Sequence, residues 1–414
     1  MAAPHIAGSA ALLLSAKPDW YGISNFGRFM RVRSALMNTS NMSVTVSGGV
    51  SATLADMGAG RVDLVRAINP VLVFDPASIS FNRLLITGTR VLTVTNVTTG
   101  SVVYNFSVDK TGDPITTALY SITSNPVSLT LAGGQTGVFT VSVDAAALPG
   151  GDYEGQMFWT SGSKKLHIPY FFRKSNSVFE NLVEIATRTG SNITQTYSGQ
   201  VGISITDVVV SVYGLADPQV STTTITIDDD IGGADPTTNP LDATRGWALI
   251  TRTLAADAGR LVVGTSSTLD DVDLYLLYDF DSDGFDFPLD LISASAGGSA
   301  NELADDVTLP AERGNNVLIA VHNFSSSPGS VTLTQWEATR TNSPALQVTN
   351  VPTSMVAGDL INPIVSFSKT LALNEMYFGL VNIGSSSNET LLASTRVDVI
   401  QVPTKLYMPL VKRN

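Results

Sequence analysis

The first fifteen residues, MAAPHIAGSAALLLS, constrain this chain more than any other stretch, because they contain no Asp, Glu, Lys or Arg. A helix of this composition has no polar face, so it is predicted to lie inside a large domain. Pro4 fits a helix only in the first turn, where its missing N–H has no hydrogen bond to lose. The sequence therefore predicts a buried helix that begins at or just before Met1.

Residues 1–8, MAAPHIAG, resemble the nucleophile segment of subtilisin-like serine proteases, which reads Gly-Thr-Ser-Met-Ala-x-Pro-His-x-Ala-Gly. The resemblance implies a catalytic serine immediately before Met1, with its aspartate and histidine partners further upstream. Residues 32–39 and 58–69 resemble later helices of the same catalytic domain. We therefore expect the chain to be a C-terminal part of such a protease and, as given, to lack catalytic residues and peptidase activity.

The three histidines are candidates for catalytic or metal-binding residues. His5 and Ser9 are four residues apart on the expected helix, but such a pair forms no nucleophile elbow, and the resemblance implies a structural role for His5. His167 alternates within an apolar strand and His322 ends another. Histidines so far apart in sequence argue against a His-based zinc site.

Composition limits the remaining function classes. The 414 residues can form two to four domains. Only 14% of residues are charged and the net charge is -12, which argues against a nucleic-acid partner. There is no cysteine, so there is neither a disulfide framework nor a thiolate metal site. No stretch has the roughly 18 consecutive apolar residues of a membrane span.

From Pro70 onward the sequence changes to short β-branched segments separated by Gly, Pro, Asn and Asp, which is typical of antiparallel sandwiches. Residues 150–156, GGDYEGQ, resemble a corner of fibronectin-like domains, and residues 270–278, DDVDLYLLY, resemble a strand of bacterial prepeptidase C-terminal domains. The predicted fold class is mainly β: tandem antiparallel β-sandwiches preceded by a helical remnant of an α/β subtilase domain.

The predicted domain order has six parts. They are the helical remnant (1–69), a fibronectin III/Ig-like sandwich (70–174), a linker or hairpin (175–200), a prepeptidase C-terminal-like sandwich (201–340), a small Ig-like sandwich (341–402) and a tail (403–414).

One acidic loop carries a candidate metal site. Asp279, Asp281, Asp283 and Asp290 occupy relative positions one, three, five and twelve, with Gly284 at position six. This is the spacing of an EF-hand calcium loop, apart from Asp in place of Glu at the last position and the absence of flanking helices. The spacing predicts calcium as cofactor, and a solvated acidic loop is the alternative. For the run of three aspartates at 228–230, a plain acidic turn is the stronger interpretation.

The sequence supports two candidate functions. The first is a C-terminal fragment of a secreted subtilisin-like endopeptidase whose parent cleaves proteins or peptides. The alternative is a non-catalytic extracellular binding or spacer protein made of tandem sandwiches. No ligand of the sandwiches is predicted.

Overall fold

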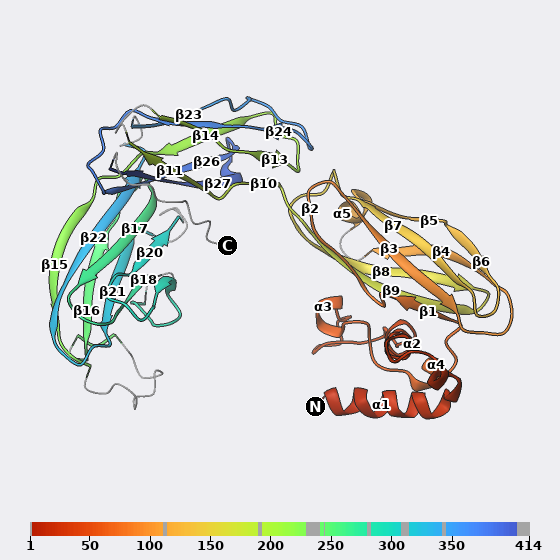
Figure 1. The fold of residues 1–414 in the computed structure, drawn as a ribbon. Helices are drawn as coiled ribbons and strands as arrows, with labels where there is room; N and C mark the ends of the chain where they lie inside the picture. The colour runs from red at the N-terminus through yellow and green to blue at the C-terminus, as the bar shows by residue number, and fades with distance from the viewer. Residues whose placement is uncertain are drawn as a thin grey trace. The chain divides into compact units, whose positions relative to one another are not determined.

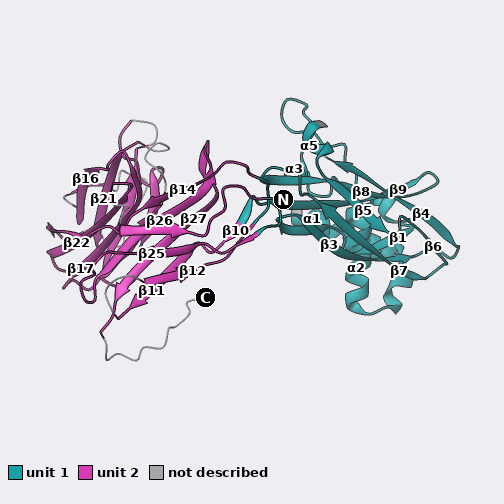
Figure 2. Ribbon diagram, turned by 90° about the horizontal axis from the view of Figure 1, so that it is seen from above, with its two compact units in different colours: residues 1–177, 201–204, 356–359 teal, residues 178–200, 205–355, 360–414 magenta. Residues whose placement is uncertain are grey.

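The computed structural model describes residues 2–110, 114–188, 193–228, 241–243, 245–279, 283–307, 314–341 and 345–403. Strands account for 52% and helices for 12% of the structure, which confirms the mainly β fold class. The chain divides into two compact units (Figure 2). Unit 1 contains residues 1–177, 201–204 and 356–359, and unit 2 contains the rest. In the described part of the chain, no helix has both the length and the apolarity to cross a bilayer.

Unit 1 begins with a helical segment, at the red end of the ribbon in Figure 1. Ser24 caps its second long helix by accepting a hydrogen bond from the Gly27 amide at 3.1 Å. A small core of Leu13, Trp20 and Ala35 holds the helices together. The elements are α1 (Ala2–Ala16), the 3-10 helix η1 (Pro18–Gly22), α2 (Asn25–Asn38), α3 (Leu54–Met57) and α4 (Leu64–Ala67).

The predicted first helix is present, and the described residues bury it only in part. Leu13 is fully buried, whereas Leu12 is 61% exposed. In α2, Phe26 is 68% exposed and Phe29 is 57% exposed. The helices thus bury a few apolar residues against each other and leave Leu12, Phe26 and Phe29 largely exposed.

The rest of unit 1 is a two-sheet sandwich with Trp159 at its centre. The Trp159 ring lies 5.2 Å from the ring of Phe74 and 5.6 Å from that of Phe139. All strand pairs are antiparallel except β2 with β9. One sheet has the order β1 (Leu72–Asp75), β3 (Thr87–Asn96), β7 (Thr136–Asp144), β5 (Ser121–Asn125). The other has the order β2 (Ile79–Leu84), β9 (Lys164–Lys174), β8 (Gly151–Ser161), β4 (Val102–Lys110), β6 (Ser128–Leu131), and α5 (Pro114–Ala118) lies between β4 and β5 in sequence.

Unit 2 contains one sandwich inserted into another. The outer sandwich has a four-stranded sheet, β11 (Leu182–Thr187), β27 (Asn388–Gln401), β26 (Met376–Ser385), β14 (Val208–Tyr213), and a three-stranded sheet, β12 (Ile193–Thr196), β25 (Ile364–Phe367), β23 (Leu346–Thr349). Three short strands form a further sheet in the order β10 (Ser177–Phe179), β13 (Gly199–Val201), β24 (Leu360–Ile361).

The inserted sandwich occupies the sequence between β14 and β23. Its first sheet has the order β15 (Gln219–Ile225), β22 (Gly329–Thr339), β17 (Ala258–Ser267), β20 (Leu303–Asp306). Its second has the order β16 (Trp247–Thr253), β21 (Asn316–Asn323), β18 (Val272–Tyr278), β19 (Leu291–Ser295). Alternating apolar residues such as Val263, Leu274 and Ile319 fill its core.

This insertion differs from the predicted domain order. Residues 175–200, predicted as a linker or hairpin, contain β11 and β12, which belong to the outer sandwich. Strand β14, predicted in the 201–340 sandwich, also belongs to the outer one. Strand β11 pairs in parallel with β27, more than two hundred positions later, so local patterning could not reveal the pairing. Of the predicted tail, residues 404–414 lie outside the described residues.

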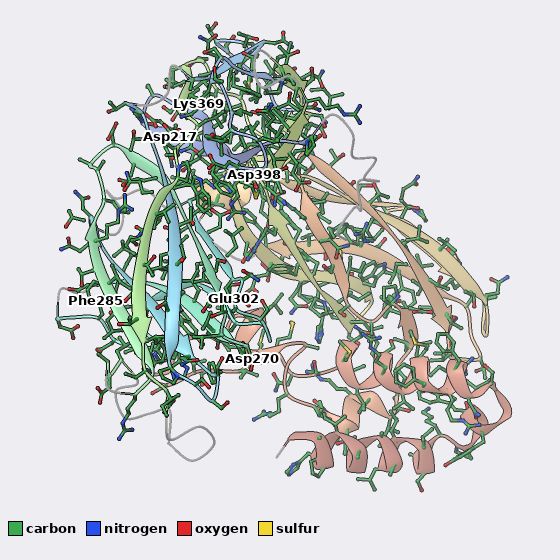
Figure 3. All side chains as sticks on the ribbon, turned by 60° about the vertical axis from the view of Figure 1, so that its left-hand side comes forward. Asp217, Asp270, Phe285, Glu302, Lys369 and Asp398 are labelled. Carbon is green, nitrogen blue, oxygen red and sulfur yellow. The ribbon has the colours of Figure 1, made fainter. Side chains whose placement is uncertain are left out.

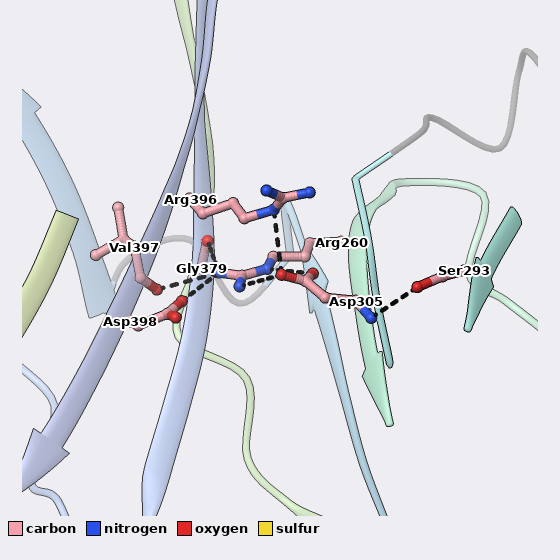
Figure 4. Close-up of polar contacts among 7 residues, drawn as sticks. All are labelled: Arg260, Ser293, Asp305, Gly379, Arg396, Val397 and Asp398. Carbon is pink, nitrogen blue, oxygen red and sulfur yellow. Dashed lines mark hydrogen bonds and ion pairs between the residues drawn. The ribbon is translucent and has the colours of Figure 1, made fainter. Parts of the chain in front are cut away.

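A buried arginine links the two sandwiches of unit 2 (Figure 4). Arg260, on β17, is 2% exposed. Its guanidinium donates to both carboxylate oxygens of Asp305 at 2.9 and 2.8 Å, to Oδ1 of Asp398 at 2.6 Å and to the Gly379 carbonyl at 2.9 Å. Arg396 adds an ion pair to Asp305 at 3.1 Å. Buried charge is tolerated here because every charged group has partners.

Candidate functional site

Polar side chains at the end of α2 fasten the helical segment to the first sandwich. Asn38 is fully buried, and its Nδ2 donates to the carbonyls of Ala77 at 2.7 Å and His167 at 2.8 Å. Ser34 donates to Asn38 Oδ1 at 2.7 Å and accepts from the Phe74 amide at 2.8 Å. Because each buried polar group has a partner, this joint fixes where α2 lies on the sheet.

The same joint contains a serine–histidine pair that resembles a nucleophile and its base. Ser40 Oγ lies 3.2 Å from His167 Nε2, but that nitrogen also lies 2.9 Å from the Ala59 carbonyl, which can only accept. Nε2 therefore carries a proton and cannot take one from Ser40. Ser40 donates instead to carbonyls, including that of Met37 at 2.8 Å. Among the described residues no carboxylate bonds the His167 ring, so the pair is structural.

The other two histidines lie elsewhere. His5 and Ser9 are on α1, with His5 exposed. His322 Nε2 lies 2.9 Å from Asp228 Oδ2, and its ring stacks on Trp247 at 4.4 Å with Phe324 edge-on at 4.3 Å. Asp229 and Asp230 lie outside the described residues. Within the described part of the chain, no hydrogen-bonded series joins His167 or His322 to both a serine and an aspartate.

The acidic loop closes on itself at the position that the calcium-loop spacing assigns to glycine. Asp279 Oδ1 accepts from the Gly284 amide at 3.3 Å, and Gly284 has a φ of 120°, which suits glycine. Asp290 is 4% exposed and its Oδ2 accepts from the Asp286 amide at 2.8 Å. Asp283 is exposed, and Asp281 lies outside the described residues.

Two phenylalanines hold this loop against the outer face of the β18 sheet. The Phe287 ring lies 5.3 Å from Tyr275 and 6.2 Å from Trp247, and Phe285 is half-buried in the same apolar cluster (Figure 3). The sequence did not predict this packing, because Trp247 is distant in the chain. Among the described residues, no three of His, Asp and Glu gather closely enough to hold a metal, so calcium binding stays a prediction.

A second acidic group lies at the start of β18. Burial raises the pKa of Asp273, whose Oδ2 accepts a hydrogen bond from the Tyr275 hydroxyl at 2.8 Å. Glu302 accepts hydrogen bonds from Ser295 and Ser299. Figure 3 labels Asp270 and Glu302 in this inserted sandwich. These bonds account for the burial of Asp273 and Glu302 as structural residues.

Comparison with known proteins finds a partial likeness. No protein-family model matches the chain. Over 82 residues it is 44% identical to the subtilisin-like protease SBT1.6 of Arabidopsis thaliana, which covers 18% of this chain and 10% of that protein. Over 85 residues it is 40% identical to the subtilisin-like protease SBT3 of Solanum lycopersicum, covering 20% and 11%. The matched part spans about a tenth of the length of these relatives.

Solved structures give weaker likenesses. Tripeptidyl peptidase 2 is matched over 99% of this chain and 47% of its own, with 10% identity and a TM-score of 0.29. The secreted serine protease VesC from Vibrio cholerae is matched over 62% and 49%, with 12% identity and a TM-score of 0.19. Scores this low carry no argument about fold. What the sequence relatives show is that a minority of this chain is similar to subtilisin-like serine proteases.

Proposed function

We propose that this chain is the C-terminal part of a secreted subtilisin-like serine endopeptidase that acts on protein or peptide substrates. The observation that carries the proposal is the 44% identity over 82 residues to a subtilisin-like protease, together with the nucleophile-like segment at residues 1–8. On this proposal the helical segment belongs to the catalytic domain, and the sandwiches are accessory domains of fibronectin/Ig-like and prepeptidase C-terminal-like type.

The exposed apolar face of the helical segment supports this reading. Leu12, Phe26 and Phe29 each expose more than half of their side-chain surface. Burying a large apolar side chain is worth about 1.5–3 kcal/mol, so these residues favour a covering partner. The parallel sheet of a complete catalytic domain would supply that cover for Leu12 and Phe29, whereas Phe26 lies beside β1 and β3 of the first sandwich. Asn38 holds α2 to that sandwich through the His167 carbonyl.

In such an enzyme the serine attacks the scissile carbonyl, a histidine takes the serine's proton and an aspartate orients the histidine. The contribution of this chain would be positional. Helix α1 would begin just after the serine, and its positive N-terminal end would favour the negative charge that develops there. The Asn38 joint would keep α2, and through Leu13 and Ala35 also α1, fixed against the first sandwich.

The test is to express the chain together with the coding sequence upstream of it. We expect an in-frame Gly-Thr-Ser before Met1, stoichiometric labelling of that serine by an active-site phosphonate, and peptidase activity that a serine-to-alanine change abolishes. The present chain alone should not be labelled. A ribosome-binding site directly before Met1 with no such frame, or labelling of Ser9, would refute the proposal.

A non-catalytic extracellular binding or spacer protein is the second candidate. It is favoured by the predominance of sandwiches in the described residues after Pro70 and by the structural roles of His167 and His322. The same experiment separates the two candidates, because only the protease proposal requires an upstream catalytic domain.

We also propose calcium as a ligand of the acidic loop. The hydrogen bond from the Gly284 amide to Asp279 supports it, because this bond closes the loop so that positions one and six lie together. Asp279, Asp281, Asp283 and Asp290 would supply the hard oxygen ligands that calcium prefers. Bound calcium would relieve the repulsion between these carboxylates and make the loop more rigid.

A further inference from the structure

A pocket of about 400 Å³ opens where the helical segment meets the first sandwich. Arg66 of α4 and Asn69, two residues after the helix, line one side. The β8–β9 hairpin lines the other with Ser163, Lys164 and Lys165. The hairpin turns at Gly162, whose φ of 56° permits the tight reversal that brings both lysines to the pocket. Apolar side chains complete its wall, namely Val65, Val71 and Leu166.

Three positive charges therefore line one concave site in a chain whose net charge is -12. Neither Lys164 nor Lys165 has an ion-pair partner among the described residues. Arg66 has one, since its Nε lies 3.4 Å from Asp63 Oδ2. That pair is exposed, with 64% of the Arg66 side chain accessible, so it binds the guanidinium weakly.

The positive potential of the pocket reaches its neighbours. Burial lowers the pKa of His167, and the charges of Arg66 and Lys165 lower it further. Lys165 is held in place because its ammonium lies 3.6 Å from the centre of the Phe158 ring. Of the three charges, Arg66 is thus paired with Asp63 and Lys165 is positioned by Phe158, while neither lysine has an ion-pair partner among the described residues.

We propose that this pocket binds a tetrahedral oxyanion, that is, a phosphate or sulfate group. The forked guanidinium of Arg66 matches two oxygens of such a group, and the two ammonium groups supply the remaining charge. Asn69 and Ser163 add neutral donors from the same walls. Because Arg66 comes from the helical segment and the lysines from the sandwich, the anion bridges the two parts and strengthens their joint.

Titration calorimetry of the full chain with inorganic phosphate, at constant ionic strength set by sodium chloride, tests the proposal. We expect saturable binding that the double variant Lys164→Gln, Lys165→Met weakens by about tenfold or more, because two charged hydrogen-bond donors are lost. Methionine keeps the apolar contact with Phe158. Hydrogen exchange at α4 should slow in phosphate in the wild type and much less in the variant.

A matched control, Lys17→Gln with Arg188→Gln, removes the same charge outside the pocket lining and should bind phosphate as the wild type does. Equal affinity of the pocket variant and the wild type, or no heat beyond that of chloride, would overturn the proposal. A sulfated disaccharide forms a third arm. Tighter binding of the disaccharide than of phosphate, abolished by the pocket variant, identifies a saccharide-borne sulfate as the source, and equal or weaker binding identifies the free ion.

Discussion

Arg260 Nη1 donates a hydrogen bond to Asp398 Oδ1 across 2.6 Å, and this bond joins β17 of the inserted sandwich to β27 of the outer one. The two residues are 138 positions apart. The bidentate contact of Arg260 with Asp305 belongs to the inserted sandwich, so one side chain serves both domains (Figure 4). The inserted sandwich is thereby joined to the outer sandwich by an ion pair as well as by the two chain segments that connect them in sequence.

Replacing Arg260 with methionine should lower the free energy of unfolding of unit 2 by about 3–5 kcal/mol, because it leaves Asp398 partly buried without its cation and leaves Asp305 with Arg396 alone. Denaturant unfolding followed by hydrogen exchange in β26 and β27 measures this loss. The control is Arg173→Met. Its exposed pair with Asp152, at 2.6 Å, should contribute about 1 kcal/mol or less. Equal losses in the two variants would show that Arg260 adds no more than a surface pair.

The cost of Arg260→Met should also depend on pH. Burial raises the pKa of Asp398 above its ordinary value of 3.8, and Arg260 opposes that rise. Without Arg260 the pKa rises further. A carboxyl whose pKa is raised by folding stabilises the folded state most at low pH, and that contribution is lost as pH rises through the folded pKa. The difference in unfolding free energy between wild type and variant should therefore shrink as the pH is lowered from neutral to about 4. A difference that does not change with pH would contradict this prediction.

His167 should make the joint between the helices and the first sandwich sensitive to acid. Burial lowers its pKa from 6.5, so folding favours the neutral ring. The stability that depends on the neutral ring is present above the unfolded pKa and is lost as pH falls from about 6.5 through the folded pKa. The protection factors of the α2 amides, which correct for the intrinsic pH dependence of exchange, should fall from pH 7.5 to pH 5. His167→Gln has an amide that can donate to the Ala59 carbonyl but cannot titrate, so a fall of equal size in that variant would refute this role.

Limited proteolysis should reveal the joint as a boundary within the helical segment. Trypsin should cut first at Arg28, because α1 buries little besides Leu13 and trypsin does not cleave the Lys17–Pro18 bond. Cleavage should stop before Ser34, where the Asn38 hydrogen bonds begin. In Asn38→Leu, cleavage should extend to Arg61, since two buried carbonyls lose their donor at a cost of about 1–3 kcal/mol each. The exposed change Asn25→Ala should leave the pattern unaltered, and a wild-type chain that trypsin trims straight to Pro70 would show that the joint does not hold.

Much of this fold could be predicted from local patterns, and the exceptions have a common cause. The short β-branched segments expected after Pro70 form strands such as β4, and residues 270–278 contain β18. Alternation within a short segment is enough for that. The parallel pairing of Leu182 with Arg396 depends on residues far apart in sequence, so the local pattern did not show that β11 belongs to the outer sandwich. The predicted linker and domain order differ from the structure for this reason.

In the candidate sites, too, local features could be predicted from the sequence and contacts between distant segments could not. The spacing of aspartates and glycine around Gly284 predicted a loop that closes there, which a local hydrogen bond to Asp279 accomplishes. The pocket of Arg66 and Lys165 was not predicted, because its walls come from segments about a hundred residues apart. Its only local signal is the adjacent pair Lys164 and Lys165 after a glycine turn.

The last prediction concerns the acidic loop. If calcium binds Asp279, Asp283 and the other two carboxylates only in the folded state, the free energy of unfolding of unit 2 should rise by about 2.7 kcal/mol at a hundredfold excess over the dissociation constant. Magnesium should substitute poorly, because it requires a tighter octahedral shell and retains its waters. Thermal melting of the full chain in calcium, magnesium and chelator measures these differences, and hydrogen exchange at Phe285 and Phe287 reports whether the loop is the site.

The variant Asp281→Asn with Asp283→Asn should lose most of the calcium effect, because it removes two of the four charged ligands that set affinity. Its matched control, Asp270→Asn with Asp286→Asn, changes the net charge equally but leaves the four predicted ligands in place, and it should retain the effect. Identical melting of the wild type in calcium and chelator would leave the solvated acidic loop as the correct interpretation. Stabilisation that survives in the ligand variant would place the ion elsewhere in the chain, with Asp228 as the next residue to substitute.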